Sequence, residues 1–289
     1  MNTTILSILT GLGGMFGWGL YDFFGGVYAK RIGPFKTFFW SQLAGLISVF
    51  LFVFFYKIAF NFPISIIVLL PIAAIVYTAG CLFFFRGFEI GNVSIVAATM
   101  NLWAVFAMMI AFIFMGQRLS TLQSLGVLMI IFGVTLASLN WSDIRNNKLQ
   151  LSSGVKETVI GAFFFGVFLN ISEVVSEEIG WLRATLFVKL GIILFLLIFS
   201  FLIKRELGLA KATTRTKIMI ALMGIFEAGG TAIVNYGLTI GDAILITPIA
   251  SGLSIVTITL AIIFLKDKVT KPQIFGMMTA ISGIIVTAF

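Results

Sequence analysis

The sequence predicts an all-α polytopic membrane protein, with ten transmembrane helices arranged as two inverted five-helix repeats. Three observations predict this fold. Of the 289 residues, 60% are hydrophobic and only 10% are charged, whereas a soluble domain is about 25% charged. The apolar residues form runs of about 20, the length that crosses a hydrocarbon core. The two halves of the chain also resemble each other. A soluble enzyme and a disordered chain are excluded, because both need far more polar residues.

Ten apolar runs, separated by charged residues, proline or glycine, define the expected helices. Helices fit these runs because the strands of a membrane barrel would give alternating segments of about 10 residues. The first run continues past Gly25 without a basic start or a small-residue cleavage site, so we interpret it as a span and not as a signal peptide. The even number of spans places both termini on one side. In order, the spans cover residues 3–29, 37–56, 63–85, 93–115, 120–139, 155–175, 181–203, 216–238, 242–264 and 271–289.

An internal repeat is the most informative feature of the sequence. Residues 80–138 align without a gap onto residues 230–288, at an offset of 150. Matches continue upstream at an offset of 147 and include several glycines, which let helices approach closely in a bilayer. The upstream matches pair Gly14, Gly19, Ile32 and Gly33 with Gly161, Gly166, Ile179 and Gly180.

The repeat divides the chain into a first five-helix unit, 1–139, a connecting loop, 140–154, and a second unit, 155–289. Because five spans is an odd number, the second unit enters the membrane from the opposite side. Inverted repeats of this kind are typical of alternating-access transporters.

Several chemistries are excluded by the residue inventory. Cys81 is the one cysteine and there is no histidine, so we expect no intrachain disulfide, thiolate metal site, catalytic triad or histidine proton relay. We predict no metal and no cofactor. The sequence has no phosphate-binding loop, so ATP does not drive the protein directly. The net charge of +8 comes from Lys and Arg scattered between apolar runs, a pattern that sets membrane topology and does not indicate nucleic-acid binding.

Four short motifs resemble the EamA-like half of the drug/metabolite transporter superfamily. They are Phe16-Gly17-Trp18-Gly19, Thr247-Pro248, Phe264-Leu265-Lys266-Asp267-Lys268 and Gln273-Ile274-Phe275-Gly276. The resemblance covers nearly the whole chain, in two copies. It implies export or exchange of small metabolites through a central cavity, by a multi-pass protein of the cell (inner or plasma) membrane. The first copy departs from the pattern, with Ala98 where the second has Pro248 and Gln117 where it has Asp267.

Basic residues are divided unevenly between the two sides. Loops after odd-numbered spans hold fifteen of the nineteen Lys and Arg residues, and the other side holds Lys57, Arg118, Arg183 and Lys189. The positive-inside rule therefore places the odd loops in the cytoplasm and both termini outside. The family resemblance implies both termini inside, so the orientation is open between these two arrangements.

Glu227 is the deepest ionisable residue, near the middle of the span 216–238. A charge there costs about 2.5–3.5 kcal/mol on the insertion scale, so a glutamate at this position is expected to have a functional or structural role. Thr231 and Asn235 follow on the same helix face, which favours a hydrated cavity. We predict that Glu227 is either the proton-coupling carboxyl or the counter-charge for a cationic group of the substrate. The alternative is a structural ion pair with Lys189, which lies about 12 Å into its own span.

Other polar residues in the spans are candidates for the same site. Asp22 follows Tyr21 and is one turn beyond Trp18; a structural role for Asp22 is equally open. Asn170 precedes Glu173 by about one turn, and we expect Glu173 at a solvated helix end.

A further set of hydroxyls lies on span nine. Thr247, Ser251 and Ser254 are spaced along one helix face, and the repeat partner of Ser251 is Asn101. Equivalent positions of two inverted repeats meet near the membrane centre, where substrates bind. Trp103 is expected to face lipid or a neighbouring helix.

These features predict a secondary active transporter, an exporter or exchanger, and not an enzyme. Its substrates would be small polar metabolites, amino acids or other zwitterionic or cationic solutes, since a phosphate would require several cavity Arg or Lys residues. The partners are the substrate, protons or a counter-substrate, and the bilayer; the oligomeric state is open. The alternatives are a channel or an intramembrane protease. The aspartates for a protease would be Asp22 and Asp242, but Thr239 replaces the motif glycine.

Overall fold

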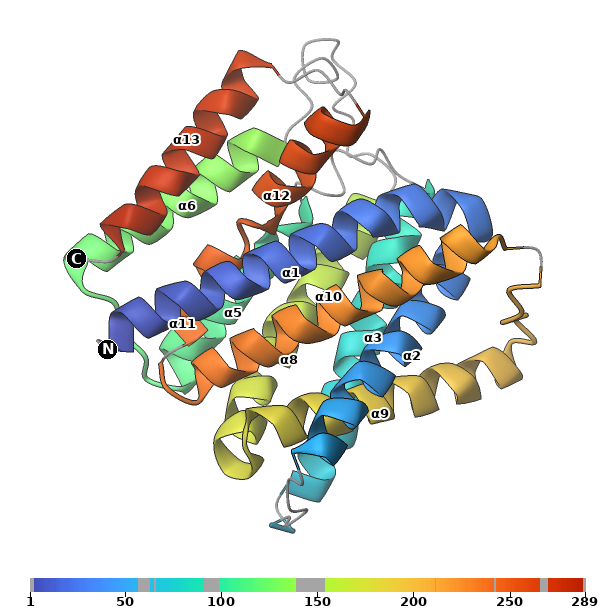
Figure 1. Ribbon diagram of the computed structural model, residues 1–289. Coiled ribbons are helices and arrows are strands. Elements are labelled where there is room, and N and C mark those ends of the chain that lie inside the picture. The colour runs from blue at the N-terminus through green and yellow to red at the C-terminus, as the bar shows by residue number, and fades with distance from the viewer. Residues whose placement is uncertain are drawn as a thin grey trace.

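The computed structural model describes residues 3–56, 63–64, 66–90, 99–138, 154–210, 212–241, 243–265 and 270–287. Every regular element in these ranges is helical (Figure 1). The first half contains α1 (Thr3–Ile32), α2 (Pro34–Phe55), α3 (Ile66–Ile90), α5 (Leu102–Phe114) and α6 (Thr121–Ser138). The second half contains α8 (Val155–Ile179), α9 (Trp181–Leu202), α10 (Thr214–Leu238), α11 (Ala243–Ala250), α12 (Leu253–Leu260), the π-helix η1 (Ala261–Leu265) and α13 (Lys271–Val286).

The described helices occupy all ten expected positions. Seven segments are long and apolar enough to cross a membrane, among them the composite Ala243–Phe264. Three shorter apolar helices, Leu102–Phe114, Thr121–Leu136 and Lys271–Val286, lie at the positions of spans four, five and ten. The all-α polytopic membrane fold is therefore confirmed. The loop 140–154, apart from Gly154, lies outside the described residues, as do Ala98, Asp242 and Asp267.

Two glycines explain why α1 and α8 run beyond their predicted ends. Gly33 separates α1 from α2 and has a φ of 90°, and its repeat partner Gly180 separates α8 from α9 with a φ of 82°. Positive φ favours glycine because it has no Cβ. Each helix can therefore continue up to its glycine and be followed at once by the next helix. The equal backbone conformation at these two matched positions is a local sign of the repeat.

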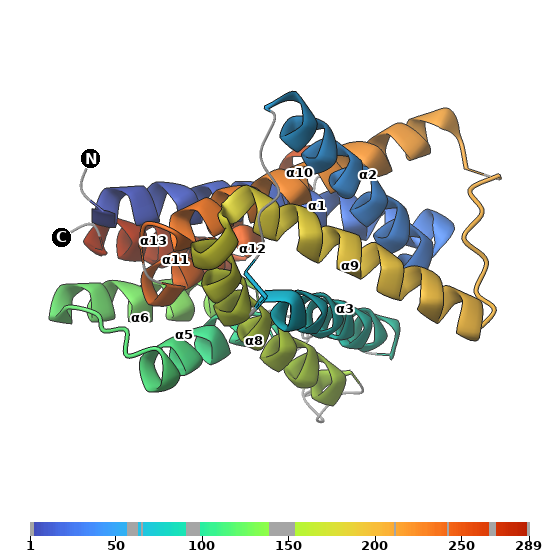
Figure 2. The same ribbon diagram turned by 90° about the horizontal axis from the view of Figure 1, so that it is seen from below.

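Helices of one repeat pack against helices of the other. α1 lies along α10, and their repeat equivalents α8 and α3 also lie side by side (Figures 1 and 2). The same symmetry holds where α6 crosses α13. A Cβ added to Gly126 would lie 2.7 Å from the Gly283 carbonyl oxygen, and one added to Gly133 would lie 2.5 Å from that of Gly276. Since Gly126 matches Gly276 and Gly133 matches Gly283, the two contacts are equivalent under exchange of the repeats.

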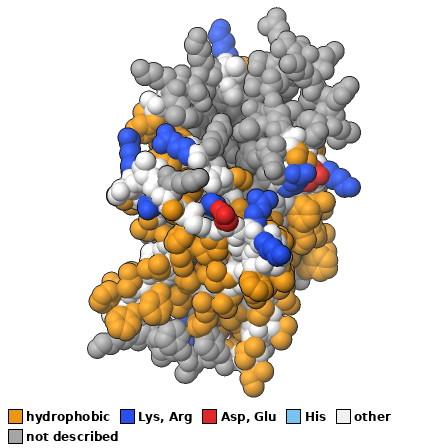
Figure 3. Space-filling model, turned by 90° about the vertical axis from the view of Figure 1, so that its right-hand side faces the viewer, with side chains coloured by type: hydrophobic (Ala, Val, Ile, Leu, Met, Phe, Trp, Pro, Cys, Tyr) orange, Lys and Arg blue, Asp and Glu red, His pale blue; other side chains and the backbone are white. Residues whose placement is uncertain are grey.

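The outer surface is suited to a bilayer. Large apolar side chains such as Phe55, Phe114 and Phe201 are 74%, 79% and 84% exposed, as expected of residues that face lipid. Figure 3 shows one end of the molecule, on which Lys and Arg side chains gather above a broad apolar area. This end holds the connection from α9 to α10.

Span nine differs from the continuous helix expected over 242–264. α11 ends at Ala250 and α12 begins at Leu253. Pro248 has no N–H to donate and lies in the last turn of α11, and Gly252 donates its N–H to the Ile249 carbonyl oxygen in a tight turn. Ser251 lies between the two helices, and its N–H still donates to the Thr247 carbonyl oxygen at 2.9 Å, one turn earlier.

Candidate functional site

A buried ion pair joins α9 to α10 in the interior of the helix bundle. The Lys189 ammonium contacts Glu227 Oε2, and both residues are only 2% exposed. Neither side chain is near a helix end, since Lys189 is the ninth residue of α9 and Glu227 is the fourteenth of α10. Removing one partner of such a pair would leave a single buried charge, which costs about 3–5 kcal/mol.

Glu227 accepts hydrogen bonds from three side chains. Lys189 donates to Oε2, while the Tyr77 hydroxyl donates to Oε1 at 3.1 Å and the Thr231 hydroxyl donates to Oε1 at 3.0 Å. An ionised carboxylate is an acceptor only. All three partners of Glu227 supply donors to this acceptor.

Lys189 has a second partner on α2. Its ammonium donates to Gln42 Oε1 at 3.0 Å. Gln42 is fully buried, and its Nε2 has no hydrogen-bond partner in the described part of the chain. A buried polar group without a partner costs about 1–3 kcal/mol.

The ion pair lies where the two repeats meet. Gln42 precedes Lys189 by 147 residues, and Tyr77 precedes Glu227 by 150. These are the two offsets of the internal repeat, so each hydrogen bond joins a residue to its own equivalent in the other half. Two equivalent positions can touch only close to the axis that relates the repeats. The ion pair is therefore close to that axis.

Polar contacts continue from Glu227 along α10. Thr231 accepts a hydrogen bond from Trp18 Nε1 of α1 at 3.1 Å. One turn later, Asn235 donates to the Thr185 hydroxyl of α9 and accepts from the Ser172 hydroxyl of α8, each at 2.9 Å. In addition to α10, five described helices thus contribute polar side chains to this network: α1, α2, α3, α8 and α9.

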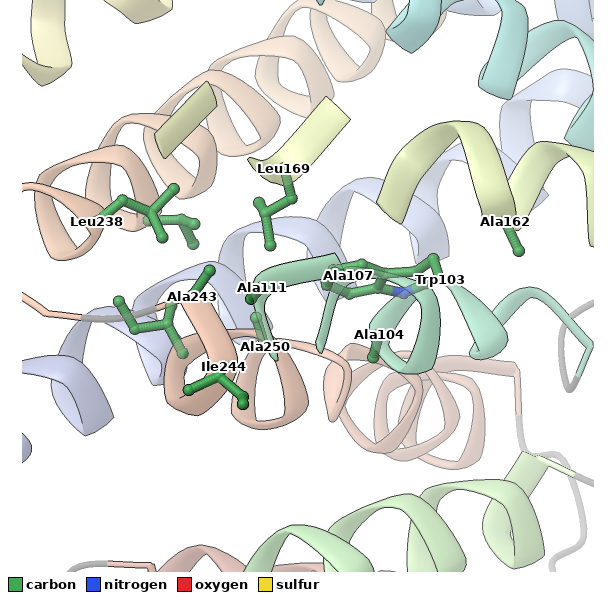
Figure 4. Packing of buried hydrophobic residues seen from close by; sticks show 12 residues of the cluster. Trp103, Ala104, Ala107, Ala111, Ala162, Leu169, Leu238, Ala243, Ile244 and Ala250 are labelled. Atoms are coloured by element: carbon green, nitrogen blue, oxygen red, sulfur yellow. The ribbon is translucent and has the colours of Figure 1, made fainter. Parts of the chain in front are cut away.

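Trp18 and Trp103 form the apolar side of this region. Their rings meet edge to face, with centroids 5.8 Å apart. Figure 4 shows Trp103, Ala104 and Ala107 on α5, close to Leu169 of α8. Trp103 is 7% exposed, so it faces neighbouring helices and not lipid.

The remaining candidates are not hydrogen-bonded to the ion pair in the described part of the chain. Asp22 is partly exposed on α1. The hydroxyl of Tyr21 is buried without a hydrogen-bond partner there. Asn170 donates to the Ala107 carbonyl oxygen at 3.1 Å and joins α8 to α5. Asn101 Oδ1 accepts a hydrogen bond from the Ser254 hydroxyl at 3.2 Å, and the Ser251 hydroxyl donates to the Pro248 carbonyl oxygen at 2.6 Å.

The expectation that Glu173 is solvated is wrong. Glu173 is 1% exposed, and its Oε1 accepts hydrogen bonds from Gln117 Nε2 at 2.8 Å and from the Ala243 N–H at 3.2 Å. The Gln117 amide oxygen accepts from the Ile244 N–H at 3.0 Å. Glu173 and Gln117 thereby bind two free N–H groups at the start of α11, where the helix dipole favours a carboxylate. α8 continues four residues past the end expected for it, so its solvated end carries Glu177 and Glu178 instead.

Sequence reasoning missed Gln42 as a partner of Lys189, and it missed the hydrogen bond from Tyr77 to Glu227. Both were accessible through the repeat, because applying the offsets to Lys189 and Glu227 points to them. A surface hollow of about 190 Å³ lies elsewhere, between the start of α1 and α11, with Ser7, Arg118 and Ile244 in its wall. None of the ion-pair residues lines it. Among the described residues, no three His, Cys, Asp or Glu side chains are grouped to hold a metal ion.

Comparison with known proteins agrees with this architecture. The sequence model of the EamA-like transporter family matches residues 5–139 and again residues 152–289. The uncharacterized protein MJ1333.1 of Methanocaldococcus jannaschii is 31% identical over 124 residues, which are 43% of this chain and 88% of that protein. Because 124 residues make up 88% of it, that relative is about 140 residues long, close to one repeat. A solved structure, described only as a crystal structure of a protein, shares the fold with a TM-score of 0.77 at 12% identity, covering 97% of this chain and 96% of its own.

Proposed function

The chain belongs to the EamA-like transporter family, and we propose that it carries small zwitterionic solutes, amino acids among them, across the cell membrane by alternating access. Its family and its apolar helices identify it as an integral multi-pass membrane transporter of the drug/metabolite type. The substrate class, the mechanism and the membrane are the parts proposed here. A secondary transporter of this kind exports its substrate or exchanges it for a second solute.

The observation that carries the proposal is the Lys189–Glu227 ion pair on the axis between the repeats. In inverted-repeat transporters, substrates bind near the membrane centre at the interface of the repeats. A ligand that enters between two paired charges must replace each partner with a charge of the same sign. A zwitterion does so at both ends, whereas a simple cation or anion leaves one buried charge unpaired. The pair therefore favours zwitterions over either.

Proton coupling through Glu227 is a second candidate role. The carboxylate is buried in the middle of α10 and contacts the one buried lysine in the described part of the chain. Protonation of Glu227 would neutralise it and release Lys189, which is a direct way to link a proton to the state of the pair. This role and zwitterion binding use the same side chain and are compatible.

Counterflow in proteoliposomes tests the substrate class. Phenylalanine, leucine and serine are each compared with the amine that lacks the carboxylate and the acid that lacks the amino group. We expect saturable exchange of at least one amino acid and little exchange of its amine or acid. Glu227→Gln should abolish exchange. The matched control is Glu206→Gln, because Glu206 is an exposed glutamate that also pairs with a lysine, Lys36, at an N–O distance of 3.9 Å.

Two results would contradict the proposal. Exchange of the amines or acids as fast as the amino acids would show that both charges are not required. Normal exchange by the Glu227→Gln protein, with an unchanged pH profile, would show that the ion pair takes no part in transport or coupling.

A further inference from the structure

We infer that Gln42 and Lys189 together bind the carboxylate end of the substrate, and that Gln42 is a specificity-determining residue of this transporter. The inference rests on the proposed function and extends it. It assigns the orientation of the zwitterion between α2 and α10, and it names a residue whose type by itself suggests no role.

The orientation of the Gln42 amide is the first step. Its oxygen faces the Lys189 ammonium at 3.0 Å. The reverse orientation would place an NH₂ group against an ammonium, two donors with no acceptor between them. The amide nitrogen is therefore directed elsewhere, and it has no hydrogen-bond partner in the described part of the chain, although Gln42 is fully buried.

The second step is the balance of donors and acceptors around the pair. Lys189 has three N–H groups and uses two, on Glu227 and Gln42. The Gln42 amide nitrogen adds two more that are unused. On the other side, Glu227 already accepts from Tyr77 and Thr231. The unused N–H donors of Lys189 and Gln42 thus lie on the α2–α9 side, while the Tyr21 hydroxyl of α1 is a buried group without a partner that can donate or accept. A carboxylate is the acceptor that suits several converging N–H donors.

The third step follows the ion pair as the substrate enters. The substrate carboxylate takes the place of Glu227 Oε2 on Lys189 and accepts from the Gln42 NH₂. Glu227 retains the hydrogen bonds from Tyr77 and Thr231, which hold it in place, and its released Oε2 faces the substrate ammonium. No buried charge is left without a partner. The Tyr77 ring is packed against Phe38 and Phe168, with centroids 6.5 and 4.8 Å away, so the site has an apolar wall beside its charges.

Masking the substrate carboxylate provides the test. The amino acid that the unmodified protein exchanges best, among phenylalanine, leucine and serine, is compared with its carboxamide, which keeps the ammonium but has no carboxylate. The measured quantity is the preference, the ratio of the two apparent affinities. Gln42→Leu keeps a side chain of similar size and removes both donors. We expect this variant to bind the amino acid about tenfold or more weakly and to lose the preference by the same factor, since hydrogen bonds to charged groups are worth that much.

The outcomes of this test distinguish a failure of the inference from a failure of the proposed function on which it rests. If the unmodified protein exchanges none of the three amino acids, the proposed function fails. If it does exchange one and Gln42→Leu leaves the preference unchanged, the inference is wrong. This holds whether the affinity is retained or falls equally for the amino acid and its carboxamide. An equal fall would mean that Gln42 has a structural role or binds only water. Should Gln42→Leu not fold, Gln42→Glu replaces it. Its carboxylate would occupy Lys189, so we expect a folded protein that has lost the amino acid preference, and a retained preference would again overturn the inference.

Discussion

At the scale of single residues, the central question is how a lysine and a glutamate are tolerated in an apolar interior. Each has hydrogen-bond partners besides the other residue of the pair: Gln42 accepts from the Lys189 amine, and two hydroxyls donate to the Glu227 carboxyl group. Buried ion pairs contribute little net stability compared with apolar residues of the same volume. Net stability therefore gives no reason for the pair, in agreement with the proposed role in which the two charges separate.

Single and double substitutions of the pair should differ in stability. Glu227→Gln leaves Lys189 as an unpaired buried charge, and we expect the free energy of unfolding to fall by about 3–5 kcal/mol. Adding Lys189→Met removes that charge and should restore most of the loss, while transport stays abolished. Thermal unfolding in detergent measures the first effect, and proteoliposome exchange measures the second. Equal unfolding temperatures for the single and double variants would show that the two charges are not coupled.

At the scale of helices, the position of the site depends on how closely α10 approaches α2. Gly224 lies about one turn before Glu227, and a Cβ added to it would overlap the carbonyl oxygen of Ser41, the neighbour of Gln42 in the chain. The absence of a side chain at Gly224 is therefore what allows α2 to bring Gln42 to the ion pair. Small residues have this function at many helix contacts in membranes, because packing there replaces the hydrophobic driving force.

Two glycines of α10 give a matched pair of substitutions. Gly224→Ala should push α2 away, which we expect to cost about 1–3 kcal/mol of stability and to weaken substrate affinity through Gln42. Gly229→Ala should leave stability unchanged or slightly raised, because a Cβ there meets no atom within 4 Å and alanine favours helix more than glycine. Unfolding temperatures and exchange assays on both proteins check this. A mild effect of Gly224→Ala would mean that the contact with α2 can relax.

At the scale of the whole molecule, the orientation in the membrane is open between two arrangements, and the distribution of charge favours one of them. The loops that follow odd-numbered spans carry most of the basic residues, and the end of the molecule that holds the α9–α10 connection shows Lys and Arg side chains in Figure 3. The positive-inside rule predicts that this end faces the cytoplasm. The resemblance to the family implies the opposite orientation.

Labelling from one side of the membrane decides the topology. A cysteine introduced by Ala212→Cys, between α9 and α10, is exposed to an impermeant maleimide in intact cells whose protein also carries Cys81→Ser. By the charge rule we expect no labelling until the membrane is permeabilised. Labelling from outside would place the termini inside and show that charge alone misleads for this chain.

Much of the architecture was predictable from the sequence, because a bilayer imposes simple rules. Run length and composition determined an all-helical membrane protein with ten spans, and the offsets of 150 and 147 determined its two repeats. These properties are local, or depend only on comparing one half of the chain with the other, so no knowledge of packing was needed.

Only the tertiary structure decided which polar groups meet. The sequence offered Glu227 and Lys189 as buried charges, and a pair between them as one alternative. The repeat offsets point to Gln42 and Tyr77 as their equivalents, but only the structure shows that these residues bind the pair. It also placed Glu173 in solvent, whereas packing of α8 against α5 and α11 buries it. The break in span nine at Ser251 was hidden as well. The physical reason is the same in each case. The hydropathy of a residue records the cost of burying it, whereas its hydrogen-bond partners come from other helices. How closely those helices approach depends on side-chain packing, which no local sequence pattern encodes.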